Sequence, residues 1–139
     1  MKEITDLLKH RDPFLFVDKV TMEDNLIVGE RTFKESEVFF KGHFPDYPIV
    51  PGVILVEAMA QCGGAGLRKF HIMESSNFVL IKIENARFHK EVKPGETVKM
   101  IIKNELISET VINQSGKAFV DNKLVVRAEW MCAIKPEMK

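Results

Sequence analysis

One stretch of the chain, residues 53–70, is apolar on nearly every face of the helix that its length and composition predict. Such a helix cannot lie with one side in water, so it must be surrounded by protein. Within it, Gly63, Gly64 and Gly66 each cost the helix about 1 kcal/mol relative to alanine. We therefore expect another element, either a sheet or a partner helix, to approach this segment closely.

The rest of the chain is rich in strand-forming residues. We expect strands over residues 13–20, 26–33, 78–84, 97–103 and 124–134. Strands segregated from a single helix are typical of an α+β domain with an antiparallel sheet. A helix that is apolar all round must then be wrapped by that sheet.

The connections carry two further signals. Pro45, Pro48 and Pro51 exclude a helix from the loop over residues 36–51. Turn residues occur both at 115–116 (Ser-Gly) and at 121–122 (Asp-Asn), and local propensity does not decide which of them joins the last two strands.

Length and charge limit the function. The chain has 139 residues, which predicts a single domain over residues 1–139. Twenty basic residues balance twenty acidic ones, which argues against a broad nucleic-acid surface and gives weak protection against self-association. No signal peptide and no membrane-spanning run is visible, so we expect a cytoplasmic protein. Cys62 and Cys132 lie among apolar residues and are expected to be buried, reduced thiols.

Two polar residues interrupt the apolar helix. Glu57 and Gln61 are four positions apart and therefore share one helix face. A carboxylate inside a buried helix is unfavourable unless it is paired or protonated. Glu57 is therefore either a structural residue that reaches an edge or a lysine, or a general acid.

A second candidate precedes the helix. His43 lies in a proline-stiffened loop and is of the residue type most used for acid–base chemistry near neutral pH. At the helix start, the backbone N–H of Gly52 could stabilise a developing oxyanion. A base, an acid and an oxyanion site within residues 43–57 would suit proton abstraction next to a carbonyl. We interpret His10 and His89 as structural or surface residues and expect no metal site.

These residues resemble a known family. Residues 42–53 read GHFPDYPIVPGV, and residues 57–61 read EAMAQ. The pattern is similar to the signature of the (3R)-hydroxyacyl-acyl-carrier-protein dehydratases of type II fatty acid synthesis. HRDPFLFVDKV at residues 10–20, ARF at 86–88 and VKPGE at 92–96 extend the resemblance over most of the chain.

The resemblance implies the hot-dog fold, an antiparallel sheet wrapped around one long central helix. It also implies that the turn lies at 121–122 and that residues 115–116 are inside a strand. Members of the family are homodimers with two shared active sites, and the dimers commonly form hexamers as trimers of dimers. His43 would come from one subunit and Glu57 from the other.

The implied reaction is the reversible loss of water from a 3-hydroxyacyl thioester to give a trans-2-enoyl thioester, in fatty acid or related polyene or polyketide synthesis. His43 would take the α-proton, Glu57 would protonate the departing hydroxyl, and the Gly52 N–H would hold the thioester carbonyl. Gln61 would orient Glu57, and Phe88 would line the substrate tunnel. No cofactor is implied, because the chemistry is proton transfer alone.

The implied partner is an acidic acyl carrier protein whose phosphopantetheine arm enters the tunnel. Arg87, Lys90 and Lys93 are the basic residues that we expect at the tunnel mouth. Two alternatives stay open: a hot-dog acyl thioesterase, and a non-catalytic subunit that binds the acyl carrier protein.

Overall fold

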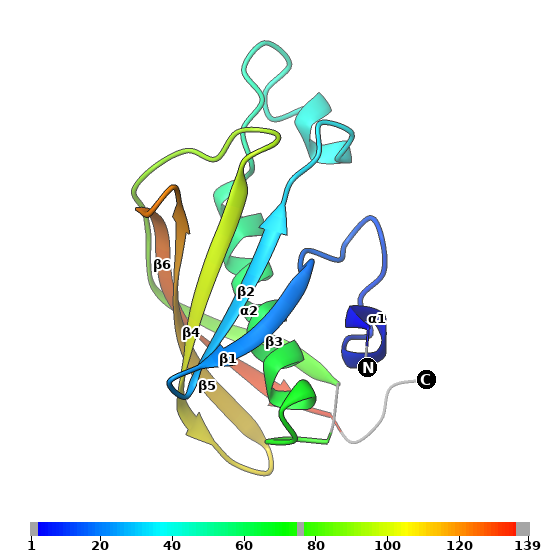
Figure 1. Ribbon diagram of the computed structural model, residues 1–139, viewed down its shortest axis with the longest axis vertical. Coiled ribbons are helices and arrows are strands. Elements are labelled where there is room, and N and C mark those ends of the chain that lie inside the picture. Colours follow the sequence, from blue (N-terminus) through cyan, green and yellow to red (C-terminus); the bar gives the residue numbers. More distant parts are fainter. Residues whose placement is uncertain (1–2, 75–76, 136–139) are drawn as a thin grey trace.

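The computed structural model describes residues 3–74 and 77–135. A long helix, α2 (Gly52–Lys69), lies in the curl of a six-stranded antiparallel sheet (Figure 1). The strands are β1 (Lys19–Glu23), β2 (Leu26–Thr32), β3 (Phe78–Phe88), β4 (Thr97–Ile107), β5 (Val111–Val120) and β6 (Lys123–Ile134). Two short elements, α1 (Ile4–Leu7) and the 3₁₀ helix η1 (Val38–Lys41), precede α2. This is the α+β, hot-dog architecture that the sequence predicts.

The strands run in the order β1-β2-β4-β5-β6-β3, so β1 and β3 form the two edges. The sheet curls because its strands twist, and α2 contacts all six of them. Eleven of the 18 residues of α2 are buried. At Gly63 an added Cβ would lie 2.1 Å from Oε1 of Gln114 on β5. The element that approaches the helix closely at its glycines is therefore the sheet.

Two tight hairpins set the register. Asp24 and Asn25 have φ angles of 51° and 65°, and Asp121 and Asn122 have φ angles of 50° and 64°. Positive φ at both central residues defines the type I′ turn, whose twist matches that of the flanking strands. The turn at 121–122 is thus confirmed, and residues 115–116 lie inside β5.

Two local expectations were wrong. The strand expected over residues 13–20 begins only at Lys19, so residues 13–18 are not in a strand. The backbone of this segment bonds instead to a side chain: the Phe16 N–H donates to Oε1 of Gln61, and Nε2 of Gln61 donates to the Phe14 carbonyl. The loop over residues 36–51 also contains a helix, η1, which forms because it ends before the first of the three prolines.

A polar network lies between α2 and the sheet. The indole N–H of Trp130 donates to Gln114 Oε1 at 3.2 Å, and Gln114 Nε2 donates to Asn104 Oδ1 at 2.8 Å. Cys62 and Cys132 are free and buried, as predicted. Burial raises the pKa of each thiol to about 12, and the charge of Glu57 adds to the shift at Cys132. In the described ranges, no helix is long and apolar enough to span a bilayer.

Candidate active site

His43 lies in the loop between η1 and α2, and its backbone is bonded on both sides. Its N–H donates to the Phe39 carbonyl, and its carbonyl accepts from the Ile49 N–H, both at 3.0 Å. The side chain is held as well, because Nδ1 is 3.1 Å from the Ile49 carbonyl oxygen. A carbonyl can only accept, so Nδ1 carries the hydrogen and the lone pair of a neutral His43 is on Nε2. The ring is thus prepared to take a proton through Nε2.

The pocket beside His43 has a volume of about 410 Å³ and is also lined by Gly52, Phe88 and Lys90. Gly52 is the first residue of α2, where the N–H groups have no acceptor within the helix. An added Cβ at Gly52 would lie 2.6 Å from a ring atom of Phe88, so the aromatic ring fits against the helix start only because this residue is glycine. The structure therefore brings His43, Gly52 and Phe88 together.

Glu57 lines a different pocket, of about 400 Å³. Its side chain is 20% exposed, and Gln61 Nε2 donates to its Oε2 at 2.9 Å. The amide of Gln61 cannot turn over freely, because its Oε1 accepts from the Phe16 N–H at 2.7 Å. Gln61 therefore presents an N–H to Glu57.

His10 also belongs to the Glu57 pocket, which the sequence interpretation missed. Its Nε2 lies 3.5 Å from Oε2 of Glu57. His10 precedes the chain segment that Gln61 binds, and it opens the HRDPF run that carries part of the family resemblance. That run was the available signal, but the contact joins residues 47 positions apart and cannot be read from local pattern.

The pockets of His43 and Glu57 share no lining residue. Helix geometry accounts for this separation. Glu57 is five positions after Gly52, which places the two residues about 140° apart around the helix axis and about 7.5 Å apart along it. Within one chain, the base with its N–H donor and the carboxyl therefore face different sides of α2.

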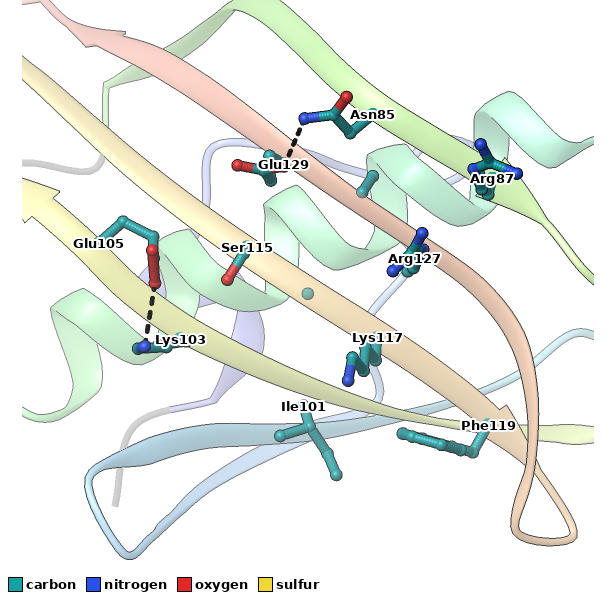
Figure 2. A pocket seen from close by; sticks show the side chains of 12 residues that line it. Asn85, Arg87, Ile101, Lys103, Glu105, Ser115, Lys117, Phe119, Arg127 and Glu129 are labelled. Atoms are coloured by element: carbon teal, nitrogen blue, oxygen red, sulfur yellow. Dashed lines mark hydrogen bonds and ion pairs between the residues drawn. The ribbon is translucent and has the colours of Figure 1, made fainter.

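A hollow of about 880 Å³ lies on the opposite face of the sheet from α2 (Figure 2). Arg87, Arg127 and Lys117 form a row across it on three neighbouring strands, each directly opposite the next. Within the described ranges, none of the three side chains has an ion-pair or hydrogen-bond partner, whereas the side chain of the neighbouring Lys103 pairs with Glu105 at 3.4 Å. Like charges directly opposite one another destabilise a sheet, so this row favours an anionic partner.

The hollow contains none of the candidate catalytic residues. The expected basic rim is also divided, because Arg87 lies in the hollow and Lys90 lies in the His43 pocket. Along β3, Arg87 and Phe88 point to opposite faces of the sheet, as successive strand residues must. The row of cations thus begins one residue from the wall of the His43 pocket.

Comparison with known proteins agrees with this architecture. The model of the FabA-like domain family matches residues 8–129. The chain is 44% identical to the 3-hydroxyacyl-[acyl-carrier-protein] dehydratase FabZ of Solibacter usitatus, over 96% of this chain and 84% of that protein. It is 39% identical to the protein of the same name from Xanthomonas euvesicatoria, over 96% of this chain and 91% of that one.

Among solved structures, the dehydratase heterocomplex ApeI:P from Xenorhabdus doucetiae matches with a TM-score of 0.80 and 18% identity, covering 99% of this chain and 93% of that chain. A hypothetical thioesterase with coenzyme A from Streptococcus pneumoniae matches with a TM-score of 0.61 and 13% identity, covering 87% and 90%. At these identities the structural likeness speaks for the fold alone. The family match establishes that the chain belongs to the FabA-like family.

Proposed function

We propose that this protein is a 3-hydroxyacyl-[acyl-carrier-protein] dehydratase, a hydro-lyase of fatty acid biosynthesis that acts in the cytoplasm as one domain over residues 1–139. The curated relatives of that name, at 37–44% identity over nearly the whole chain, support the activity. The observation that carries the proposal in the structure is the fixed orientation of His43. Its Nδ1 is bonded to the Ile49 carbonyl, which leaves Nε2 as a base beside the start of α2.

The reaction follows from these groups. Nε2 of His43 removes the α-proton of the 3-hydroxyacyl thioester, and the negative charge moves to the thioester oxygen. The N–H of Gly52, aided by the positive end of the α2 dipole, stabilises that oxyanion. Glu57 gives its proton to the 3-hydroxyl as the carbon–oxygen bond breaks, so that water leaves and the trans-2-enoyl thioester forms. Phe88 lines the acyl tunnel, and the reaction requires no cofactor.

The simplest test follows the dehydration of 3-hydroxybutyryl thioester, or the hydration of crotonyl thioester in reverse. The wild type should be active, and His43→Ala and Glu57→Gln should each abolish turnover while remaining folded. His71→Asn is a matched control, because His71 is exposed and lines neither of the two pockets. Release of free thiol without hydration would identify a thioesterase instead, and normal turnover by a folded His43→Ala protein would refute the assignment.

We also propose that each active site is shared between two copies of the chain, with His43 from one and Glu57 from the other. The separation of the two pockets in one chain supports this. So does strand β3, an edge strand whose Val79, Ile81 and Ile83 are 37%, 54% and 47% exposed. An exposed apolar edge strand is a template for pairing with another chain. We further propose that three such dimers form a hexamer, which a measurement of the mass in solution tests.

Mixing the two inactive variants tests the shared site directly. In a dimer of one His43→Ala chain and one Glu57→Gln chain, one site has both residues intact and the other has neither. After random exchange at equal concentrations, half of the dimers are mixed and half of their sites are active, so about a quarter of the wild-type activity should return. No recovery, with exchange shown by mass, would place both residues of a working site in one chain.

The proposed partner is an acidic acyl carrier protein that delivers the thioester. The row formed by Arg87, Arg127 and Lys117 supports an anionic partner and lies one residue from the His43 pocket. Arg127→Thr should raise KM for a carrier-protein thioester and weaken its dependence on salt. KM for the same acyl group on pantetheine alone should be unchanged. Equal effects on both substrates would refute this docking surface.

A further inference from the structure

The carboxyl group of Glu57 is held from one side only. Gln61 Nε2 is 2.9 Å from Oε2, and His10 Nε2 is 3.5 Å from the same oxygen. Among the described residues, no group within hydrogen-bond distance of Oε1 is found, and the side chain is 20% exposed to the pocket. The two oxygens therefore have different surroundings: Oε2 lies near two nitrogens, and Oε1 has no such neighbour among the described residues.

The surroundings of Nδ1, the second ring nitrogen, indicate the protonation state and tautomer of His10. Nδ1 is buried and has no hydrogen-bond partner among the described residues. A buried N–H without an acceptor is rarely tolerated, so the hydrogen of a neutral ring is on Nε2, where Glu57 can accept it. The imidazolium form would need a hydrogen on Nδ1 as well. The geometry thus favours a neutral ring even though a carboxyl group is adjacent.

The groups around the His10 ring shift its pKa in both directions. Burial lowers the pKa of His10 below its ordinary value; the charge of Glu57 opposes this shift, and that of Arg11 adds to it. Arg11 is itself turned toward backbone carbonyls, those of Thr5, Leu8 and His10. Lys9, from the same segment, and the Cys132 thiol, from β6, are the other titratable groups that line the pocket.

We propose that His10 is a positioning residue for Glu57: its neutral Nε2–H, together with the amide of Gln61, holds Oε2, so that Oε1 carries the reacting proton into the pocket. This inference rests on the proposed dehydratase function, in which Glu57 is the acid. The protonated carboxyl group of Glu57 carries a single proton. Because Oε2 faces N–H donors, that proton is on Oε1. A neutral donor orients the carboxyl group without the full positive charge that would favour its ionised form.

The kinetic test compares His10→Phe, which fills the space without a donor, with His10→Gln, which keeps a neutral N–H. In the dehydration of 3-hydroxybutyryl thioester, His10→Phe should lower kcat roughly 10- to 100-fold with little change in KM, as misplacement of a reacting group does. The basic limb of its pH profile should move to higher pH, because the carboxylate has lost a hydrogen-bond donor. His10→Gln should restore both, and His71→Asn should behave as the wild type.

A purely structural role for His10 predicts a different pattern. Both His10 variants would then lose activity in proportion to their loss of stability, with the basic limb unmoved. That result, or a His10→Phe protein with normal kcat and pH profile, would overturn the inference. Wild-type protein that turns over no acyl thioester would refute the proposed function instead.

A second measurement does not depend on activity or on any variant folding. Nitrogen NMR of the wild-type protein reports which ring nitrogen carries the hydrogen. His10 should be in the Nε2–H form, and more than half of the rings should be neutral at pH 6.5, the ordinary pKa of histidine. An Nδ1–H form, or a ring that is half charged at or above that pH, would overturn the inference whether or not the protein is an enzyme.

Discussion

Gly63→Ala is a test of how the long helix meets the sheet. On helix propensity alone, the substitution should stabilise the protein by about 1 kcal/mol. The structure predicts the opposite, because the new Cβ would lie 2.1 Å from Oε1 and 2.7 Å from Cδ of Gln114, whose side chain is 1% exposed. The amide must move, and the indole N–H of Trp130 then loses its acceptor.

Two terms set the size of the effect. Overpacking in a core costs about 1–3 kcal/mol, and a buried polar group without its partner costs a further 1–3 kcal/mol or so. After subtracting the gain in propensity, Gly63→Ala should destabilise the fold by about 3 kcal/mol. With a urea m-value of about 1–3 kcal/mol/M, the unfolding midpoint should fall by roughly 1–3 M.

A double-mutant cycle identifies the cause. Gln114→Ala removes the side chain that the new methyl group meets, so adding Gly63→Ala to it should cost much less than adding Gly63→Ala to the wild type. Gly42→Ala is the matched control, since a Cβ there meets nothing within 4 Å. A Gly63→Ala protein as stable as the parent, or strictly additive effects with Gln114→Ala, would refute the reasoning.

Three further predictions concern stability. Arg127→Thr should raise the unfolding free energy by about 0.5 kcal/mol at low salt, and by less at high salt, because Arg127 faces Arg87 on one side and Lys117 on the other. Asn122→Val should lower it by about 1–2 kcal/mol, because φ at this turn residue is 64°, whereas Asn122→Gly should not. Both buried thiols have pKa values raised from 9.0 to about 12, so above pH 9 the unfolded chain binds fewer protons than the folded one. Unfolding free energy should therefore fall with rising pH, by up to about 1.4 kcal/mol per unit for each thiol, and Cys62→Ala should lessen the slope in urea titrations.

The long helix and most strands could be predicted because each is specified by its own residues. The apolar run at 53–70 predicts α2 to within one residue at either end. Local propensity left two turns open between the last two strands, and the family resemblance placed the turn at 121–122, where Asp121 and Asn122 have positive φ. His43, Gly52 and Glu57 were likewise visible as residue types in a short segment. Whether they meet in one active site is not a local property, and within one chain they line two pockets.

What local pattern could not predict depends on contacts between distant residues. Gln114 was not singled out, because an amide inside a strand is notable only when Trp130 and Asn104 are known to bond to it. His10 was interpreted as a structural or surface residue, because it lies in a segment of mixed polarity. Both residues acquire their surroundings from partners at least 10 positions away, beyond the reach of helical or strand periodicity.

The one strand that was predicted wrongly shows how the fold and the site depend on each other. Residues 13–20 have strand propensity, but the Gln61 amide takes the Phe16 N–H and the Phe14 carbonyl that a neighbouring strand would need. The same amide donates to Glu57. Those two backbone bonds orient Gln61, and the irregular segment that they hold lies between His10 and β1. The irregular backbone before β1 is therefore part of what positions the Glu57 carboxyl group, and its strand-like sequence serves a site rather than a sheet.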